Sequence, residues 1–166
     1  MKGIQILDCT LRDGAQVNEA RFGGQAVIDI IKNLRDAQID MIECGFLKNV
    51  TFEEGRTYFP QPSFAKRYIP EERGNSRYAA LVDLDRYDAA NLEEYDGRSF
   101  DLIRISFFEK DIGSVENFAK IIASKGYSIS IQPMDTFSYC EEHLRQVIEL
   151  ANHLRPETLS IVDTYS

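Results

Sequence analysis

Short apolar runs alternate along this chain with longer segments in which apolar residues recur at helical spacing. The apolar runs predict strands at residues 4–10, 41–46, 78–82, 102–108, 128–132 and 159–162. They are rich in Ile, Leu and Val, as expected for strands that are buried on both faces. The pattern therefore predicts a buried parallel sheet.

Helices are predicted between these strands, at residues 24–38, 89–95, 114–124 and 139–154. Ser114 is expected to cap the start of the third helix, and Gly126 is expected to end it. Pro156 prevents the last helix from continuing. Strands and helices that alternate in this way indicate parallel strands joined by crossover helices.

Two α/β architectures share this pattern, a doubly wound open sheet and a (β/α)8 barrel. The number of predicted strands does not separate them. The sequence contains no GxGxxG and no Walker motif, so no nucleotide-binding fingerprint favours the open sheet. Both architectures stay open on the pattern alone.

The segment at residues 47–77 breaks the rhythm, because Pro60, Pro62 and Pro70 interrupt it. A connection this long is usually functional or partly disordered. It is either a lid that selects the substrate or a decorated, partly helical connection. Four basic residues in it could meet an acidic substrate, and solvated surface charge explains them equally well: Lys48, Arg56, Lys66 and Arg67.

Composition narrows the function classes. Hydrophobic residues make up 43% and charged residues 28% of the chain, which fits a soluble globular protein. A formal net charge of −8 argues against nonspecific nucleic-acid binding, although arginines and a metal ion can still dominate a pocket. No apolar run approaches the ~20 residues that a membrane helix needs, and no signal peptide is recognisable.

The cysteine pattern bears on the compartment and not on the chemistry. Cys9, Cys44 and Cys140 are odd in number and show no CxxC spacing. A reduced, cytoplasmic compartment is the simplest interpretation, with each cysteine a small buried residue by default. We therefore expect a cytoplasmic protein with no nucleic-acid or membrane partner.

The most informative string follows the first predicted strand and reads Asp-Cys-Thr-Leu-Arg-Asp-Gly over residues 8–14. The aspartate of an adjacent Arg-Asp pair can hold a divalent cation, and the arginine can stabilise an oxyanion beside it. On spacing alone, such a pair is more often a surface ion pair. Residues 6–16 as a whole resemble the opening of the metal-dependent TIM-barrel superfamily that includes hydroxymethylglutaryl-CoA (HMG-CoA) lyase, isopropylmalate and homocitrate synthases and 4-hydroxy-2-oxovalerate aldolase.

This resemblance favours the barrel. A full TIM barrel needs eight strands and typically ~250 residues, whereas this chain has 166 residues and about six βα units. The resemblance therefore implies that residues 1–166 are the amino-terminal part of a lyase-like catalytic domain, of the pyruvate carboxyltransferase type, with the remaining strands beyond residue 166. A complete small α/β domain with an open sheet is the alternative.

The resemblance also implies roles for individual residues. Asp13 matches the aspartate that binds the catalytic divalent metal, Mn²⁺, Mg²⁺ or Zn²⁺, and Arg12 matches the arginine that stabilises an enolate. Gln16 matches the lyase and synthase branches, whereas the 4-hydroxy-2-oxovalerate aldolases have a histidine there. Glu43 matches the second-strand glutamate. An acid in an apolar strand is costly unless it is paired or near a metal, and Arg12 or Arg104 would be its partner.

Two further charged residues fall in or after predicted strands. Arg104 is either a residue that faces the site or part of a salt bridge inside the barrel. Asp163 resembles the aspartate of the Asp-Thr-x-Gly sequence that ends the family's sixth strand, although Ser166 replaces the glycine. Asp163 is therefore a candidate site residue.

The family's two histidine ligands, which form a His-x-His motif, have no counterpart here. His143 and His153 are the only histidines, and both lie in the predicted helix at 139–154. The resemblance therefore implies that the histidine ligands lie beyond Ser166, and that this fragment alone is inactive.

Together, these features predict a divalent-metal-dependent carbon–carbon lyase of the aldolase type. It would cleave a 2-oxo or acyl-CoA hydroxy acid through a metal-stabilised enolate. A Claisen-type acyl-CoA condensing synthase of the same family and a non-catalytic barrel that serves as a binding module are the alternatives. The substrate, the metal and the oligomeric state, a homo-oligomer included, stay open.

Overall fold

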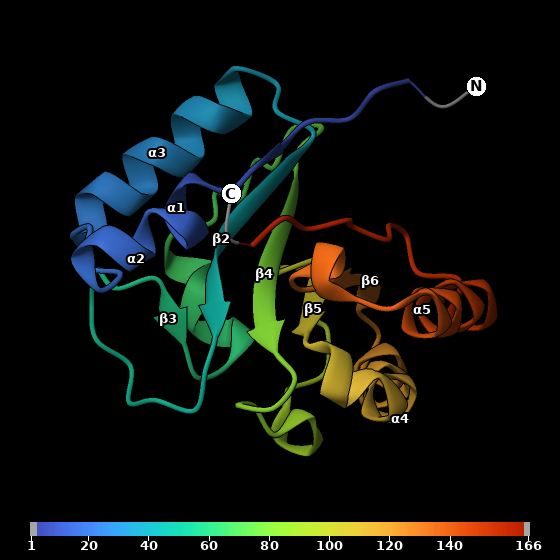
Figure 1. The fold of residues 1–166 in the computed structure, drawn as a ribbon. Helices are drawn as coiled ribbons and strands as arrows, with labels where there is room; N and C mark the ends of the chain where they lie inside the picture. Colours follow the sequence, from blue (N-terminus) through green and yellow to red (C-terminus); the bar gives the residue numbers. More distant parts are fainter. Residues whose placement is uncertain (1–2, 165–166) are drawn as a thin grey trace.

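The computed structural model describes residues 3–164, and within this range all strands belong to one parallel sheet (Figure 1). The strand order is β1-β2-β4-β5-β6, and the short β3 pairs with the other end of β2. The strands are β1 (Leu7–Asp8), β2 (Met41–Leu47), β3 (Tyr58–Phe59), β4 (Arg77–Asp83), β5 (Leu102–Phe107) and β6 (Ser128–Pro133).

Helices connect the strands and cover the outer face of the sheet. The α-helices are α1 (Thr10–Asp13), α2 (Ala15–Asn18), α3 (Gly24–Asp36), α4 (Ile112–Ser124) and α5 (Glu141–Leu154). The 3-10 helices are η1 (Pro62–Arg67), η2 (Ala89–Asn91), η3 (Glu109–Asp111) and η4 (Thr136–Ser138). In Figure 1, α3 lies with α1 and α2 beside β2, and α4 and α5 pack together at the β6 end. None of the helices described is both long and apolar enough to cross a membrane.

This arrangement is part of a TIM barrel, as the sequence predicts. Consecutive parallel strands with helices on one face curve into a half-barrel, and the other face of the sheet becomes the barrel interior. The doubly wound alternative needs helices on both faces of the sheet. Within residues 3–164, the helices cover the outer face, so the barrel interpretation is confirmed.

The alternation of side chains along the strands divides the core into two layers. The apolar layer between sheet and helices contains Ile42 of β2, Ile103 and Ile105 of β5, Ile31 of α3 and Ile122 of α4. Burial of such a layer is the main stabilising contribution in a domain of this size. The helices therefore lie on this apolar face, which leaves the opposite face for the polar strand positions.

The inner face carries an unusual number of buried polar side chains. These are Glu43 of β2, Arg104 and Ser106 of β5, and Ser130 and Gln132 of β6. Buried polar groups must be hydrogen-bonded to be tolerated. Glu43, Arg104 and Gln132 bond to one another, whereas Ser106 bonds to Asp83 and Ser130 to Thr158. The barrel interior therefore contains a buried polar layer, flanked by apolar strand positions such as Leu81 and Leu102.

A bulge at Gly45 shapes the end of β2 next to this layer. The register between β2 and β4 shifts between Glu43 and Phe46, and Gly45 has a φ of 149°. A Cβ at Gly45 would lie 2.1 Å from the carbonyl oxygen of Thr57, whose oxygen accepts a hydrogen bond from Phe46 N. Glycine is required here because the β3 connection approaches the backbone of β2 directly.

Two predicted strands are shorter than expected or missing from the described residues. The strand predicted at residues 4–10 reduces to β1, because the Asp8 carboxylate accepts hydrogen bonds from the Thr10 backbone and hydroxyl and turns the chain into α1. The strand predicted at residues 159–162 is wrong. Leu159 makes only an isolated parallel bridge to Ile131, and Val162 bonds instead to Thr136 in the loop after β6.

The helix predictions need four corrections, one of which is that the last helix begins at Glu141, two residues after its predicted start. The helix predicted at 89–95 is only the 3-10 turn η2, since the chain is extended at Leu92. Ser114 does not cap α4, because that helix begins earlier, at Ile112, with Asp111 as its N-cap residue. The first helix ends at Asp36, two residues before its predicted end, and Gln38 adopts a positive φ.

The long connection at residues 47–77 is ordered and built against the sheet. β3 pairs in parallel with β2, and η1 packs Ala65 and Tyr68 into the main core. The Tyr68 hydroxyl accepts a hydrogen bond from Gly55 N, which ties the connection to itself. This segment is therefore a decorated, partly helical connection, and its first residues reach the candidate site.

Candidate functional site

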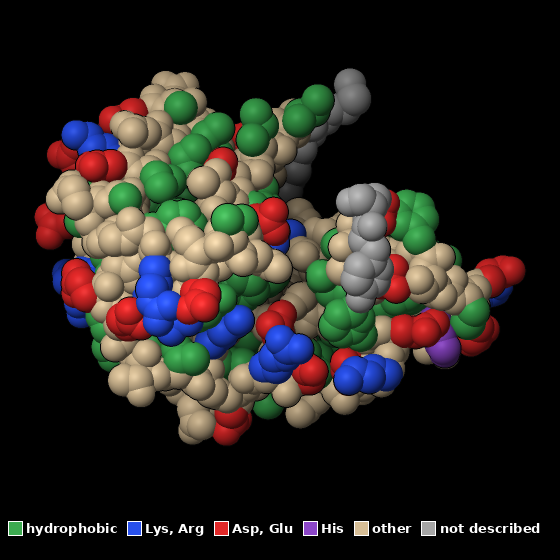
Figure 2. Space-filling model, turned by 60° about the vertical axis from the view of Figure 1, so that its left-hand side comes forward, with side chains coloured by type: hydrophobic (Ala, Val, Ile, Leu, Met, Phe, Trp, Pro, Cys, Tyr) green, Lys and Arg blue, Asp and Glu red, His purple; other side chains and the backbone are tan. Residues whose placement is uncertain are grey.

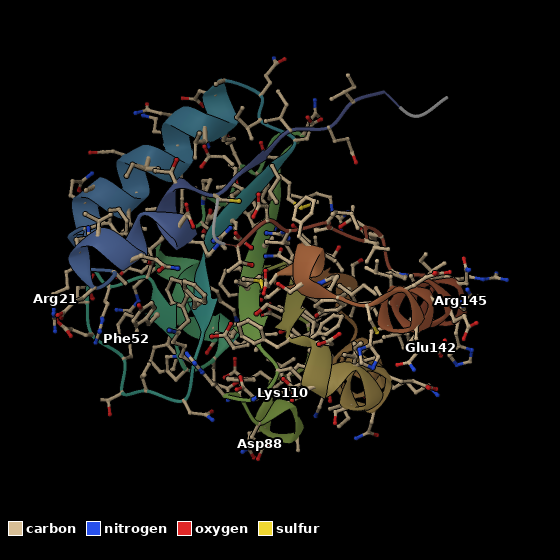
Figure 3. The ribbon with its side chains drawn as sticks, viewed as in Figure 1. Arg21, Phe52, Asp88, Lys110, Glu142 and Arg145 are labelled. Atoms are coloured by element: carbon tan, nitrogen blue, oxygen red, sulfur yellow. The ribbon has the colours of Figure 1, made fainter. Side chains whose placement is uncertain are left out.

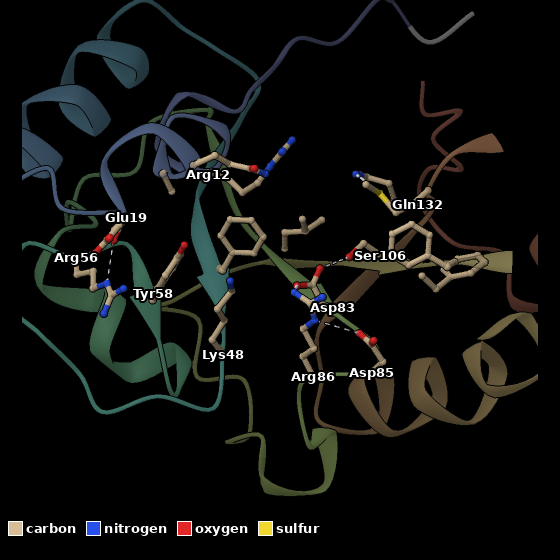
Figure 4. Close-up of a pocket in the computed structure, with 17 residues that line it drawn as sticks. Arg12, Glu19, Lys48, Arg56, Tyr58, Asp83, Asp85, Arg86, Ser106 and Gln132 are labelled. Atoms are coloured by element: carbon tan, nitrogen blue, oxygen red, sulfur yellow. Dashed lines mark hydrogen bonds and ion pairs between the residues drawn. The ribbon is translucent and has the colours of Figure 1, made fainter. Parts of the chain in front are cut away.

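A pocket of about 430 Å³ opens at the carboxyl ends of four neighbouring strands (Figure 4). Phe46 of β2, Asp83 of β4, Ser106 of β5 and Gln132 of β6 line it. Active sites of TIM barrels lie at this end, because the loops that follow the strands converge there. The pocket is therefore the candidate active site of this chain.

Glu43 is the centre of the polar layer beneath this pocket. Its side chain is fully buried, and its Oε2 accepts a hydrogen bond from Arg12 Nε at 2.6 Å. Its Oε1 accepts one from Arg104 Nη1 at 2.7 Å. One carboxylate therefore holds two guanidinium groups, and this network combines both partners that the sequence offered for Glu43.

Arg104 links Glu43 to the neighbouring strand β6 and to the segment that follows α5. Its Nη2 donates to Gln132 Oε1 and, at 3.3 Å, to Ser160 Oγ in the segment after α5. Arg104 is 6% exposed, so its charge depends on these partners. The structure thus shows the interior ion pair that the sequence suggested, and this pair positions Gln132 at the pocket wall.

Arg12 is the residue that connects the buried network to the pocket. It lines the pocket, and its Nη1 also donates to Asp13 Oδ1 at 2.7 Å. Burial alone would lower the pKa of Arg12, but the Glu43 carboxylate more than offsets this and raises the pKa above its ordinary value. Arg12 therefore keeps a fixed positive charge at the mouth of the pocket, and Figure 4 shows Gln132 on the opposite side.

The remaining predicted site residues occupy different surroundings. Gln16 lines the pocket from α2. Asp13 lies at the end of α1, and its side chain is 69% exposed. Asp163 is exposed in the segment after Leu159, and among the residues described it does not line this pocket. Its motif continues into Tyr165 and Ser166, which lie outside the described residues.

The pocket also contains charged residues that sequence analysis did not assign to a site. Lys48 and Arg56, which the sequence left as either contacts for an acidic substrate or solvated surface charge, both line it. Three more charged residues that line the pocket lie at the end of β4 and were not predicted as site residues: Asp83, Asp85 and Arg86. The position of Asp83 at a strand's carboxyl end was the available signal, whereas Arg86 depends on how the following turn folds. The other two loop cations are engaged elsewhere, since Lys66 pairs with Asp96 and Arg67 with Glu54.

Lys48 has the most distinctive surroundings of these cations. Its Nζ lies 4.6 Å from the ring centre of Phe46 and 4.2 Å from that of Tyr58. Partial burial lowers its pKa, and the charges of Arg86 and Arg56 act in the same direction, while Asp83 opposes them. Aromatic faces stabilise the cation without neutralising it, so Lys48 can attract an anionic group into the pocket.

Opposite charges are interspersed around the molecule and are not segregated. Figure 2 shows basic side chains beside acidic side chains on one face. Many of these are paired, as in Arg77 with Glu157 and Arg21 with Glu53. The cations in the pocket therefore stand out by their position on the strand ends, not by a general basic surface.

We predict that the lowered pKa of Lys48 makes the affinity for an anionic ligand depend on pH. A group with a lowered pKa loses its charge at a lower pH than an ordinary lysine, so affinity for an anionic ligand should fall as pH rises through that pKa. Lys48→Ala should weaken binding of a 2-oxo acid about tenfold at neutral pH, the value of one charge-assisted hydrogen bond.

The measurement is calorimetric titration with a 2-oxo acid across neutral and alkaline pH. Lys48→Arg should keep affinity at neutral pH and remove the alkaline loss, because arginine stays charged. Lys120→Arg on α4, where Lys120 pairs with Glu116, serves as the matched control. Unchanged affinity in Lys48→Ala would show that this cation does not contact the ligand.

Two of the three cysteines are unsuited to nucleophilic chemistry. Burial raises the pKa of Cys9 to about 11, and the nearby Glu43 charge adds to the effect. Burial likewise raises the pKa of Cys44. Both thiols therefore stay protonated at neutral pH, whereas Cys140 is exposed at the start of α5.

No protein-family model matches this sequence, and no curated protein matches it. The N-terminal domain of a proposed aldolase from Bacteroides vulgatus is similar in structure, with a TM-score of 0.67 and 18% identity over 95% of this chain and 62% of that chain. The HMG-CoA lyase from Brucella melitensis has a TM-score of 0.63 and 18% identity over 98% of this chain and 62% of that chain.

This chain has the fold of the HMG-CoA lyase-like barrel. It spans 62% of the length of both solved proteins, so it corresponds to a part of each. The fold agrees with the resemblance that residues 6–16 carry, and it places Arg12 and Gln16 of that segment at the pocket. The HMG-CoA lyase-like fold thus accounts for the half-barrel and for the position of its candidate site.

Proposed function

We propose that this chain is the amino-terminal part of a divalent-metal-dependent carbon–carbon lyase of the aldolase type. One observation carries the proposal. Arg12, next to Asp13 in the Leu-Arg-Asp-Gly sequence, is held at the mouth of the pocket by a fully buried carboxylate, Glu43. A preorganised guanidinium at this place suits a reaction in which negative charge develops on an oxygen.

The residues around Asp13 supply only part of a metal site. Asp13 offers one exposed carboxylate, and among residues 3–164 no group of three potential ligands surrounds it. A hard, oxygen-preferring cation such as Mg²⁺ or Mn²⁺ suits a carboxylate ligand. When bound, such a cation would polarise the substrate carbonyl. We propose that the remaining ligands come from a continuation of the protein beyond residue 166.

The pocket residues of this chain suit the other requirements of the reaction. A base takes the proton of the hydroxyl group next to the bond that breaks, and the electrons of that bond pass into an enolate. Asp83 is our proposed base, because it lines the pocket and its carboxylate is oriented by a 2.7 Å hydrogen bond that Ser106 Oγ donates. Arg12 stabilises the enolate oxygen, and Lys48 binds the substrate's anionic group.

The substrate class follows from these charges. A 2-oxo acid carries a carboxylate, and an acyl-CoA carries phosphates, so either would be attracted by Lys48. Arg56 and Arg86 also line the pocket, where they form ion pairs with Glu53 and with Asp83 and Asp85, respectively. The pocket volume of about 430 Å³ lies in the usual range for small-molecule sites. We propose a 2-oxo or acyl-CoA hydroxy acid as substrate, and a condensing synthase would use the same groups in the opposite direction.

We predict that Asp13→Asn in the full-length protein removes both Mn²⁺ binding and lyase activity while the fold is retained. An amide lacks the charge that a hard divalent cation needs from its ligand. The measurement is Mn²⁺ titration followed by paramagnetic resonance, together with an activity assay on 4-hydroxy-2-oxo acids and acyl-CoA esters. Asp36→Asn, which changes an exposed aspartate paired with Arg35, is the control.

The outcomes of the Asp13→Asn experiment distinguish the proposed enzyme from a second candidate function. The second candidate is a barrel that binds anions without catalysis, which the cations lining the pocket would also serve. Activity that is retained in Asp13→Asn would overturn the ligand assignment. Absence of both Mn²⁺ binding and activity in the unaltered full-length protein, with anion binding intact, would establish the binding module instead.

A further inference from the structure

We propose that Glu109, Cys140 and His143 form a binding site for a zinc-class divalent cation at the rim of the half-barrel. One ligand atom of each residue lies within 4.8 Å of the other two. The three belong to two separate elements, since Glu109 starts η3 after β5, and Cys140 and His143 stand at the start of α5. Among the residues described, no other group of three potential metal ligands occurs.

The local structure explains how the three side chains converge. Cys140 is the N-cap residue of α5, and His143 follows three residues later. The side chain of an N-cap residue faces the third residue of its helix, which is His143 here, so the two side chains lie on the same side of this helix end. The start of α5 belongs to the same apolar cluster as Phe107, through Tyr139, Leu144 and Val147. This packing places the side of α5 that carries Cys140 and His143 against the loop that follows β5. In Figure 3, Glu142, the chain neighbour of His143, lies on the side of α5 next to α4.

A simple ion pair accounts for only part of this arrangement. His143 Nδ1 lies 2.5 Å from Glu109 Oε1, which is one hydrogen bond between two partly exposed groups. That bond does not require a thiol, yet Cys140 is there as well. The chain has only three cysteines and two histidines, so a cluster of one of each with a carboxylate is uncommon.

The donor set defines the chemical class of the ion. A thiolate and an imidazole favour Zn²⁺ and Co²⁺ over Mg²⁺ and Ca²⁺, which prefer oxygen ligands. A thiolate and a carboxylate carry two negative charges in total, so a divalent cation would make the site neutral. Three protein ligands leave one tetrahedral position open, and the partial exposure of all three leaves a path for the ion.

The ion would join two parts of the barrel rim. Glu109 directly follows Phe108, which lines the pocket, whereas Cys140 and His143 belong to the helix after β6. A bound cation would fix the β5 loop against α5 and thereby hold one wall of the pocket. The site is separate from Asp13, because Asp13 does not belong to this cluster.

The test is titration of the chain with Co²⁺, whose bond to a thiolate gives an intense ultraviolet charge-transfer band. We expect one equivalent of Co²⁺ with this band, and displacement by Zn²⁺. Cys140→Ser should abolish the band. His143→Ala and Glu109→Gln should weaken binding by at least the roughly tenfold that loss of even an outer-shell partner costs. Cys9→Ser and His153→Ala are the matched controls and should bind normally.

A second measurement needs no substitution. Zn²⁺ should protect Cys140 from alkylation by iodoacetamide, with the modified cysteine identified by mass spectrometry. A band that persists in Cys140→Ser, or an alkylation rate of Cys140 that Zn²⁺ leaves unchanged, would overturn the proposal. Asp13→Asn should keep the Co²⁺ band, so failure of the lyase assignment and failure of this site are distinguishable.

Discussion

Glu43→Gln is expected to lower the free energy of unfolding by about 3–5 kcal/mol, the typical cost of breaking a buried ion pair on one side. Glu43 is fully buried and forms ion pairs with both Arg12 and Arg104. Glutamine keeps the shape of the side chain but removes its charge. Two guanidinium groups would then remain with no counter-charge from residue 43.

The measurement is urea unfolding followed by circular dichroism. Arg104→Met alone should also destabilise the protein, because Gln132 Oε1 and Glu43 Oε1 lose the hydrogen bonds that Arg104 donates. The double variant Glu43→Gln with Arg104→Met should lose less stability than the sum of the two single variants, since it removes both charges of one pair. Glu54→Gln changes an exposed partner of Arg67 and should leave the unfolding midpoint nearly unchanged.

A small effect of Glu43→Gln would contradict this account of the interior. It would mean that Arg12 and Arg104 find water or other partners as readily as the Glu43 carboxylate. Additive single and double variants would show, in the same way, that Glu43 and Arg104 do not stabilise each other. The first result would remove the structural basis for a fixed Arg12, and the second would remove the stabilising role of the pair between Glu43 and Arg104.

Arg12→Ala is expected to lower kcat of the full-length enzyme by about 10²–10³-fold with a much smaller change in KM, as for the loss of one oxyanion donor. In the proposed reaction, the guanidinium of Arg12 would act on charge that develops only in the transition state. Arg12→Lys should recover little, because a lysine cannot donate to Glu43 and to the substrate in the same fixed geometry.

Chemical rescue separates this role from a purely structural one. Guanidinium chloride at low concentration should restore part of kcat in Arg12→Ala, because the free ion can occupy the vacated position beside Glu43. Arg21→Ala, which changes an exposed arginine paired with Glu53, is the control and should need no rescue. A rise in KM with kcat unchanged would mean that Arg12 only binds substrate, and the enolate role would be lost.

Several features of this protein are determined by local sequence. The apolar runs and helical periodicities predict β2, β4, β5 and β6 closely, because strands buried on both faces read as continuous apolar segments. The segment that carries Arg12 and Asp13 also identifies the site end of the barrel. Local hydrogen bonds of Asp8 shorten the first strand, and this could not be predicted from apolar pattern alone.

Other features depend on contacts between distant segments. The bulge at Gly45 exists because Thr57 approaches β2, and the presence of Lys48 in the pocket depends on that bulge and on the packing of Phe46 and Tyr58. The partners of Arg104 come from β2, β6 and the segment after α5. No local pattern encodes such pairings, because they depend on the strand order and register.

The sequence by itself determined the order of the elements, the parallel sheet and the residues with chemical potential at the start of the chain. Apolar periodicity and a charged string after a strand are local properties, so they can be read without a fold. Only the tertiary structure decided that Glu43 binds both Arg12 and Arg104, and that Glu109, Cys140 and His143 meet. These groups are brought together by the curvature of the half-barrel, which adjacent residues do not specify.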